Sequence, residues 1–265
     1  MTRVFPQLET GAVTQFPFSK RTAQRVIINE AADGSMVRAV DATGRVEWSL
    51  TFQHLSDSEI GRLLSFFGEC QGRLLDFTFC DPTDNLLVWS EKLDEPVWER
   101  AAWVQLEPGL ADPLGSGRAW KVTNTSTNAS RFKQTIDSPG GRTYSFSVYV
   151  RSEALATVKL VRRGAVTETV VTEAVGPVWR RLSTSGELVE TCETSQFGIE
   201  LEPWGAIDLF GLQVEAQPSP SYYKQTSSRG GIYVNSRLLS DELAITADSP
   251  HSYSVTVGIG SRVSN

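Results

Sequence analysis

The chain has 265 residues, of which 40% are hydrophobic and 21% charged, and its net charge is −6. This composition suits one large domain or two of ordinary size. No Lys/Arg cluster stands out, which argues against a nucleic acid bound through its phosphates. No apolar stretch approaches the roughly 20 residues of a membrane-spanning helix. We therefore expect no specific nucleic-acid binding and no membrane insertion.

The N-terminal segment, MTRVFPQLETGAVTQFPFSKR, lacks the hydrophobic core of a signal peptide, so we expect synthesis in a cytoplasm without secretion. The three cysteines, Cys70, Cys80 and Cys192, form no CxxC pair. We expect them to be reduced and mostly buried, packing as small hydrophobic side chains. No metal site and no cofactor are expected.

The first ordered stretch is predicted to be a β-meander. Residues 25–29 and 36–40 form a hairpin around the Ala-Asp-Gly-Ser turn at 32–35, and Ala-Thr-Gly at 42–44 is expected to turn the chain again. From Val46 to Gln53 apolar and polar residues alternate, which is the pattern of a half-buried strand. We expect His54 to continue the buried or half-buried face of this strand, as a structural histidine.

The periodicity then changes from two to that of a helix. Ser-Asp-Ser-Glu at 56–59 forms a capping box, in which Ser56 and Glu59 satisfy each other's backbone N–H groups. The apolar stripe consists of Ile60, Leu63, Leu64 and Phe67, and Gln71-Gly72 ends the helix. Leu75, Phe77 and Phe79 then alternate as another strand, which Asp-Pro at 81–82 terminates.

A region rich in tryptophan begins at Asn85 and continues as short strands at regular spacing. This pattern predicts a β-sandwich or jelly roll. The expected strands are 119–124, 130–136, 144–151, 157–162, 167–172, 179–185, 194–201 and 207–215.

The last part of the chain changes character once more. Ser-Ser-Arg-Gly-Gly at 227–231 is predicted to be a linker, and residues 232–234, 243–246 and 253–257 are predicted strands. A tail of about 35 residues is too small to bury a core of its own. We therefore expect it to complete the N-terminal sheet.

The two flanks of the tryptophan-rich region resemble phage tail proteins of the distal-tail type. The similar segments are LSDSEIGRLLSFFGECQGRLLDFTFCDPTDN at 55–85 and RLLSDELAITADSPHSYSVTVGIGSRV at 237–263. In that family a Ser-Asp-x-Glu-capped helix ends at glycine and is followed by an aromatic strand and Asp-Pro, and the closing segment supplies the last strands of the same domain. The resemblance covers about half of the chain.

The middle region resembles the carbohydrate-binding-module-like jelly rolls of phage tail and fibre proteins. It opens with NLLVWSEKLDEPVWER at 85–100 and closes with IDLFGLQVEAQPSPSYYKQT at 207–226. The closing motif is the more specific, with Gly211, Gln213 and Glu215 followed by Pro-Ser-x-Tyr at 220–223. Phe210 stands where such modules commonly carry Trp or Tyr.

Together these resemblances imply a mainly β chain with one amphipathic helix at about 56–71. A β-sandwich tail domain of residues 1–84 and 229–265 would be interrupted by a jelly-roll β-sandwich of residues 85–228. By resemblance the protein would be a homo-oligomeric ring, commonly a hexamer, in the tail tip of the virion, made in the host cytoplasm. Its partners would be the tail tube, tape-measure and baseplate hub proteins.

Exposed aromatic rings can stack on the apolar faces of sugars while nearby carboxylates and amides bind hydroxyl groups. Trp204 is the first candidate for such a carbohydrate contact, because the Glu-Pro-Trp-Gly turn at 202–205 cannot easily bury it. Trp98 and Trp103, in the opening loop, come next. The competing interpretation is that a tryptophan packs in the core, which we expect for Trp89, Trp120 and Trp179.

Catalytic chemistry finds little support. The two histidines, His54 and His251, are isolated, and no Gly-x-Ser-x-Gly, P-loop or His-Glu-x-x-His motif occurs. Asp208 and Glu91 could belong to a structural calcium site, but surface carboxylates are the simpler reading.

We thus expect a non-enzymatic structural component of a phage tail tip or baseplate, whose ring joins the tube to the hub and whose module contacts host glycans. One alternative is a receptor- or glycan-binding tail-fibre module with an N-terminal attachment domain. A glycoside hydrolase is a further alternative, because paired carboxylates cannot be recognised from sequence spacing.

Overall fold

The computed structural model describes residues 3–189 and 192–264. The described chain consists mainly of β-strands with one α-helix, which confirms the expected all-β class. It divides into two compact units. Unit 1 comprises Met1–Glu9, Thr14–Phe79 and Tyr233–Asn265, and unit 2 comprises Thr10–Val13 and Cys80–Ile232. The sequence had placed these boundaries at 84/85 and 228/229, without the short piece at 10–13.

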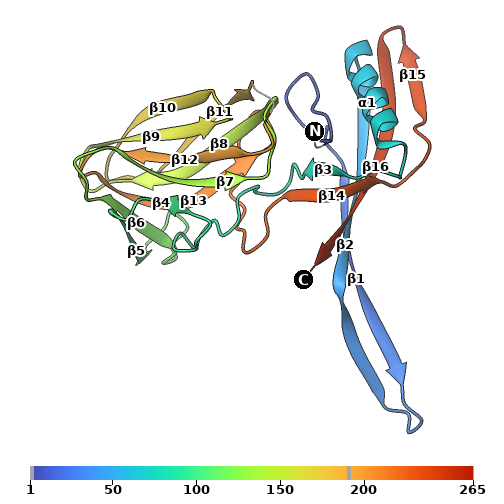
Figure 1. Cartoon of the computed structure of the whole chain (residues 1–265), viewed down its shortest axis with the longest axis horizontal. Coiled ribbons are helices and arrows are strands. Elements are labelled where there is room, and N and C mark those ends of the chain that lie inside the picture. The colour runs from blue at the N-terminus through green and yellow to red at the C-terminus, as the bar shows by residue number, and fades with distance from the viewer. Residues whose placement is uncertain (1–2, 190–191, 265) are drawn as a thin grey trace. The chain divides into compact units, whose positions relative to one another are not determined.

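Unit 1 is organised around a six-stranded sheet of order β1-β2-β16-β14-β3, with β15 paired to β16 (Figure 1). The strands are β1 (Ser19–Glu30), β2 (Met36–Leu55), β3 (Phe77–Cys80), β14 (Ile232–Leu238), β15 (Ile245–Ser249) and β16 (Ser252–Ser264). The central pair joins distant parts of the chain, because β16 runs antiparallel to β2 from Tyr253↔Leu55 to Ser264↔Thr43. The expectation that the C-terminal tail completes the N-terminal sheet is therefore confirmed.

The predicted turn at 42–44 is wrong, since β2 runs through it without interruption. The register with β1 shifts here, from Gln24↔Gly44 to Val26↔Val40, so that extra β2 residues form a bulge. Gly44 also pairs with Val263 of β16. Because β2 is paired on both sides, its extra small residues form a bulge and do not end the strand. The hairpin turn itself lies at 31–35, where Gly34 has a φ of +80°.

The helix α1 (Asp57–Cys70) begins as the sequence predicts. Ser56 Oγ accepts a hydrogen bond from Glu59 N at 3.2 Å, and Glu59 Oε2 accepts one from Ser56 N at 3.0 Å, which completes the capping box. The helix ends at Gln71 in the left-handed conformation, followed by Gly72. The buried face differs from the predicted stripe, because it consists of Ile60, Leu63, Phe66 and Cys70 while Leu64 is exposed and Phe67 half-buried.

Phe66 is buried because it contributes to an aromatic core that the N-terminal segment completes. The Phe5 ring lies 5.4 Å from Phe66 and 5.7 Å from Phe79, both edge to face. Trp48 in turn lies 4.8 Å from Phe79 and 4.7 Å from Tyr233. Such pairs add to the free energy of burying large apolar surfaces. The segment from Arg3 is held in place by a parallel bridge between Val4 and Thr78.

His54 does not continue the buried face of its strand, which corrects the prediction. Its φ of +56° interrupts the alternation, so that Leu55 rather than His54 follows Phe52 into the core. The pairing with β16 shifts register at the same place, between Tyr253 and Val255. His54 is exposed, with Nδ1 3.4 Å from Ser252 Oγ.

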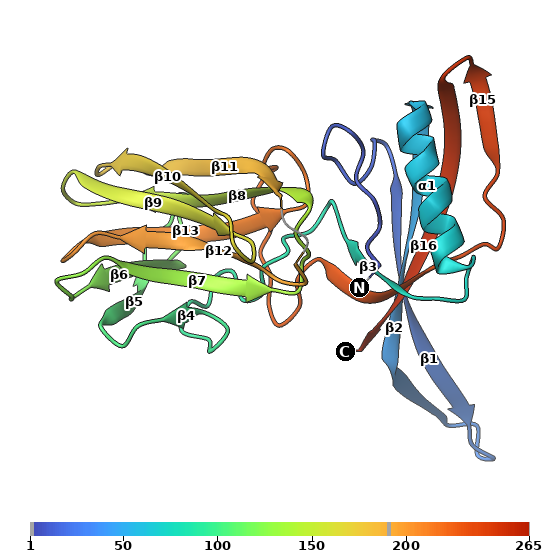
Figure 2. The same cartoon turned by 45° about the horizontal axis from the view of Figure 1, so that its top comes forward.

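Unit 2 is a β-sandwich of two five-stranded sheets, which confirms the jelly-roll class expected for the middle region (Figure 2). One sheet has the order β10-β9-β12-β7-β4 and the other β11-β8-β13-β6-β5. The strands are β4 (Glu99–Arg100), β5 (Val104–Leu110), β6 (Ala119–Asn124), β7 (Ser130–Ile136), β8 (Arg142–Arg151), β9 (Ala156–Arg163), β10 (Glu168–Val175), β11 (Arg180–Leu188), β12 (Ser195–Leu201) and β13 (Ala206–Glu215). All eight predicted strands are present, and β4 and β5 were not predicted.

The closing motif of the sandwich folds back on its own last strand. Gly211 has a φ of +64°, and a Cβ at this position would lie 3.1 Å from the Tyr223 ring, so only glycine fits. The buried Gln213 side chain accepts a hydrogen bond from Lys224 N at 2.7 Å. The buried Glu215 accepts from Ser221 N and Oγ and from Lys224 Nζ, at 2.8, 2.6 and 2.8 Å. We call Gly211, Gln213, Glu215, Ser221, Tyr223 and Lys224 the clasp.

The clasp also holds the first residues of the sandwich. Asn85 Nδ2 donates to Leu212 O at 2.9 Å, and Ser90 Oγ lies 2.8 Å from the Tyr223 hydroxyl. The prediction of a linker at 227–231 is wrong, because this segment is hydrogen-bonded to the opening residues. Gly231 O accepts from Asp81 N, and Gly231 N donates to Asn85 O, both at 2.8 Å. A Cβ on Gly230 would lie 2.6 Å from Leu86 O, so this segment packs tightly beside the opening one.

The cysteines behave as small buried side chains in two of three cases. Cys70 and Cys80 are buried and Cys192 is partly exposed, and all three are free. Burial raises the pKa of the Cys70 thiol to about 11. A thiol of this kind is a poor nucleophile at neutral pH.

The helix contacts predict an order of stabilities. Replacing Ser56 with Ala should lower the free energy of unfolding by about 1 kcal/mol, through loss of the cap. Leu63→Ala should cost roughly 2–5 kcal/mol because that side chain is buried against the sheet. Leu64→Ala is the matched control and should cost less than about 0.5 kcal/mol. Urea denaturation measures all three, and equal losses at Leu63 and Leu64 would contradict the orientation of α1.

The clasp predicts a contrast between two lysine–glutamate pairs whose lysines are almost equally exposed. Lys224–Glu215 and Lys121–Glu153 have N–O distances of 2.8 and 2.7 Å, but the Glu215 side chain is 0% exposed and the Glu153 side chain 83%. Glu215→Ala should cost about 2–3 kcal/mol, because buried donors lose their acceptor. Glu153→Ala should cost under about 1 kcal/mol. Comparable thermal shifts for the two variants would show that the clasp does not stabilise the sandwich.

Candidate functional site

Loops at one end of the sandwich carry Trp204 and Trp103, two of the three tryptophans that the sequence singled out. Strand β13 runs from Ala206 at this end to Glu215 in the clasp, and Leu86 N bonds to Val214 O near the clasp end at 2.8 Å. The loop at 202–205, which carries Trp204, therefore lies at the end of the sandwich opposite to the one where the chain enters and leaves the module. The loops at 125–129 and 152–155 lie at the same end (Figure 1).

Trp204 is held in a constrained turn with its ring in solvent. Its side chain is 66% exposed and its φ is +58°, a conformation that few residues other than glycine adopt. Trp204 N donates to Ser126 O at 3.2 Å, and Gly205 N donates to Glu202 O at 3.0 Å. An exposed aromatic residue kept in an uncommon backbone conformation is typical of a binding position.

Asn124, which was not among the residues predicted from the sequence, fixes this turn. It is buried, its N–H donates to Gly205 O at 2.8 Å, and its Nδ2 donates to Glu202 O at 3.0 Å and Asn128 O at 2.8 Å. One side chain thus ties the loop at 125–129 to the loop at 202–205. An asparagine at the end of a strand, where its amide can satisfy loop carbonyl groups, is the only signal that could have indicated this.

A hollow of about 410 Å³ lies beside the Trp204 ring, which is within the size range of small-molecule sites. Lys121, Glu153, Leu155, Glu202 and Asp208 are among the residues that line it. Its charged groups are paired: Lys121 with Glu153 at 2.7 Å, Arg151 with Asp208 at 2.8 Å, and Lys159 with Glu202 at 2.8 Å. The hydrogen bond from Lys121 holds the pKa of Glu153 below its usual value. Carboxylate oxygens that can accept hydrogen bonds therefore lie beside an aromatic face.

Trp103 belongs to the same end of the sandwich. Its side chain is 49% exposed, and its Nε1 donates to Ser130 Oγ at 2.6 Å. Its carbonyl oxygen accepts hydrogen bonds from Thr125 N and Oγ1, which joins it to the 125–129 loop. Trp103 thus presents part of one ring on a fixed backbone.

Trp98 is not available to a ligand, which corrects the prediction. It is only 2% exposed, its ring stacks on Phe132 at 5.0 Å and 12°, and its Nε1 donates to Trp89 O at 3.0 Å. The opening loop folds back against β7, so this ring becomes part of the core. Of the three tryptophans expected to be core residues, Trp120 is buried while Trp89 and Trp179 are half-buried.

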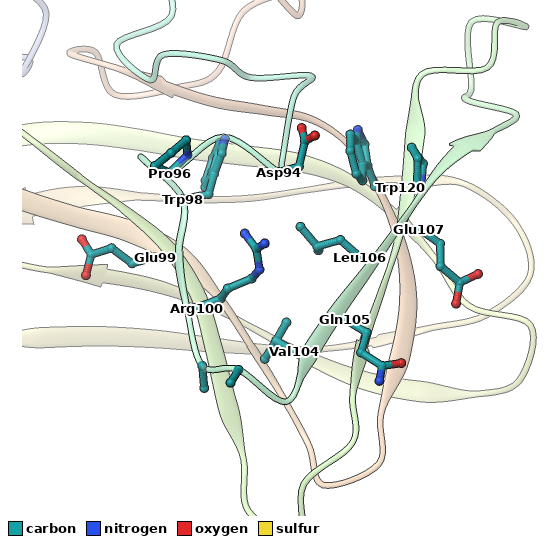
Figure 3. Close-up of a pocket in the computed structure, with 13 residues that line it drawn as sticks. Asp94, Pro96, Trp98, Glu99, Arg100, Val104, Gln105, Leu106, Glu107 and Trp120 are labelled. Carbon is teal, nitrogen blue, oxygen red and sulfur yellow. The ribbon is translucent and has the colours of Figure 1, made fainter.

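A second, wider hollow of about 980 Å³ lies between the opening segment and β5 (Figure 3). Arg100 and Leu106 extend into it, whereas Glu99 and Glu107 point outward. Its two tryptophans, Trp98 and Trp120, are buried, and the Trp120 indole N–H is already bonded to Glu91 O at 2.9 Å. This hollow offers no open aromatic face.

The outward face of the β10-β9-β12-β7-β4 sheet carries a network of ion pairs. Arg131 makes two hydrogen bonds to Glu168, of 2.7 and 2.8 Å, and a third to Glu200 of 2.8 Å. Lys159 also binds Glu200, at 3.0 Å, and the pKa of Glu168 is lowered mainly by its hydrogen bonds from Arg131. The Trp204 end differs from this network in its exposed aromatic ring, and it is therefore the better candidate for ligand binding.

The remaining polar candidates have structural partners. Asp208 pairs with Arg151, and Glu91 pairs with Arg118 at 2.9 Å, so the two carboxylates considered for calcium each bind a different arginine. His251 Nδ1 lies 2.5 Å from Asp57 Oδ2 in unit 1, far along the chain from the Trp204 loops. Among the described helices, none is long and apolar enough to cross a bilayer.

Neither a protein-family model nor a curated protein sequence matches this chain. Solved structures do show similarity over about half of it. The enzymatically active domain of tailspike protein 4 from bacteriophage CBA120 is 14% identical, with a TM-score of 0.42, and covers 52% of this chain and 22% of its own. A xylan-binding domain of carbohydrate-binding module family 22 is 11% identical, with a TM-score of 0.43, and covers 53% and 100%.

A family 61 carbohydrate-binding module, solved with β-1,4-galactotriose, is 14% identical with a TM-score of 0.41 and covers 49% of this chain and 97% of its own. The present chain thus spans only about a fifth of the tailspike structure but nearly all of either binding module. At such low identity and TM-score, neither ligand nor activity transfers from these proteins to this one.

Proposed function

We propose that this protein is a structural component of a bacteriophage tail tip or baseplate, in which unit 1 assembles into a homo-oligomeric ring and unit 2 binds host glycans. The ring joins the tail tube to the tip hub and contacts the tube, tape-measure and hub proteins. The protein resides in the virion and has no catalytic role.

The observation that carries the glycan-binding part is the position of Trp204. Its exposed ring stands on a turn fixed by Asn124 and Ser126, beside a hollow lined by ion-paired carboxylates. An aromatic ring covers the apolar face of a sugar, and fixed oxygen acceptors bind its hydroxyl groups. Because the turn is already ordered, binding loses little conformational entropy.

The assembly part is supported by the architecture of unit 1. The pairing of β16 with β2 is the arrangement that the resemblance to distal-tail proteins implies for the closing segment. Strand β1 forms an edge of the sheet along its whole length. Exposed edges in stable proteins are usually paired or covered, and a ring of identical copies covers them by contacts between neighbours.

A glycoside hydrolase is disfavoured by the electrostatics of the Trp204 hollow. Such enzymes need one carboxylic acid that stays protonated near neutral pH, alongside a carboxylate. Here Asp208, Glu202 and Glu153 each bind a cationic side chain. The hydrogen bond from Lys121 also holds the pKa of Glu153 below its usual value, which is the reverse of what a general acid requires.

Removal of the Trp204 ring should weaken glycan binding and leave the fold intact. We expect Trp204→Ala to reduce affinity on a glycan array roughly tenfold, the equivalent of about 1.4 kcal/mol, and Trp103→Ala to reduce it less. Tyr222→Ala is the control, because Tyr222 is also an exposed aromatic residue but lies beside the clasp. Equal effects of Trp204→Ala and Tyr222→Ala would argue against a site at the Trp204 end.

Oligomerisation should belong to unit 1 alone. Residues 82–230 can be replaced by a short Gly/Ser bridge, because Asp81 N and Gly231 O lie 2.8 Å apart. We expect light scattering to give the same number of subunits for this deletion variant as for the full chain, and isolated residues 80–232 to be monomeric. A monomeric deletion variant together with an oligomeric sandwich would reverse the assignment and favour the tail-fibre alternative.

A further inference from the structure

The β1–β2 hairpin carries apolar side chains that nothing in the described chain covers. Every residue from 19 to 39 is exposed, and we call this stretch the arm. Its exposed large apolar residues are Val26, Ile27, Ile28, Met36 and Val37. In both views of the molecule the arm extends beyond the rest of its sheet (Figures 1 and 2).

The apolar residues occupy both faces of the arm. Neighbouring residues of a strand point to opposite sides, so Val26 and Ile28 lie on one face and Ile27 on the other. The pairing Asn29↔Val37 adds Val37 to the face of Ile27, and Glu30↔Met36 adds Met36 to the face of Val26. A two-stranded ribbon of this kind is marginally stable in water. Burial against another surface would stabilise it.

A groove of about 520 Å³ lies along α1 at the other end of β2. Its apolar lining comes from Val4, Pro6 and Phe66, and the helix contributes the small residues Ser58, Gly61 and Ser65. Small side chains on a helix allow a second backbone to approach closely. The acidic residues Asp57 and Glu69 lie in the same lining, whereas Arg62 is drawn towards Glu9 at 3.6 Å.

The arm and the groove both present apolar side chains, and their charges are opposite in sign. Lys20, Arg21, Arg25 and Arg38 outnumber Glu30 and Asp33 on the arm. The arm cannot reach the groove of its own chain, because β2 separates Arg38 from the start of α1 by roughly 60 Å of extended strand. A neighbouring copy is not limited in this way.

We propose that the arm of one copy docks in the α1 groove of the next. Val26 and Ile28 then cover Val4, Pro6 and the small exposed part of Phe66. The basic residues of the arm meet Glu69 and also Asp57, whose carboxylate is bound by His251 and Tyr253 of its own chain. Since each copy gives an arm at one end of β2 and receives one at the other, the contact is heterologous and repeats from copy to copy. This inference rests on the ring of the proposed function and identifies the surfaces that hold it together.

Glycine substitutions in α1 test the groove without disturbing the chain's own fold. A Cβ added at Gly61 or at Gly68 meets no atom within 4 Å, but only Gly61 lines the groove. Phenylalanine is also more favourable than glycine inside a helix. We expect Gly61→Phe to reduce the mass from light scattering to that of one chain, 29.2 kDa, and Gly68→Phe to keep the oligomer of the unsubstituted chain.

Charge on the arm should have the same effect as a blocked groove. Ile28→Asp is expected to give folded monomers, since Ile28 is 57% exposed and not part of the core. Leu74→Asp is the matched control, being 59% exposed in the same unit, and should remain oligomeric. An oligomer in which Gly61→Phe and Ile28→Asp behave like their controls would overturn the docking and leave the proposed ring standing. If the unsubstituted chain is a monomer, both the docking of the arm and the proposed ring are wrong.

Discussion

The antiparallel pairing of β2 with β16 is the constraint on which the remaining structure depends. It joins residues as far apart as Thr51 and Thr256, whose hydroxyls lie 3.3 Å apart across 205 positions of sequence. Closing a flexible loop of roughly 150 residues between such strands would cost about 4 kcal/mol in chain entropy. A folded sandwich whose ends already meet removes most of that cost, since Gly231 is hydrogen-bonded to both Asp81 and Asn85. Unit 1 can therefore contain an insertion and still form one sheet.

The clasp brings the two ends of the inserted sandwich together. Tyr223 packs over Gly211, and Glu215 holds Ser221 and Lys224, so that the end of the module returns to its beginning. Gly211, Gln213, Glu215, Ser221 and Tyr223, the most specific part of the resemblance to carbohydrate-binding modules, thus close the domain, and none of them lines the candidate ligand site. That site lies at the opposite end of the sandwich, away from the segments that connect it to unit 1. Structural closure and the candidate ligand site thus occupy separate ends of one sandwich.

The elements were predictable where local chemistry decides them, as in the capping box of Ser56 and Glu59 and the eight alternating strands of the sandwich. Errors occurred where tertiary contacts override local signals. The turn expected at 42–44 became a bulge because β2 is paired on both sides, and Phe66 replaced Phe67 in the core because Phe5 packs there. For the candidate site, the Glu-Pro-Trp-Gly turn was enough to indicate that Trp204 would be exposed. No pattern near Trp98 indicated that it would stack on Phe132, because that contact depends on how the opening loop folds back. Asn124 was missed because its partners come from two loops that are about 80 residues apart.

The proposed function requires that this chain assembles with itself through unit 1 and that the sandwich stays free to bind a ligand. Negative-stain electron microscopy of the purified full-length protein tests it most directly, because ring, filament and single particle are distinguished in one image. We expect closed rings of uniform size, in which each subunit contributes one sandwich as a separate lobe. A field of single particles at concentrations of tens of micromolar would contradict the claim, as would rings in which the sandwiches form the contacts between subunits.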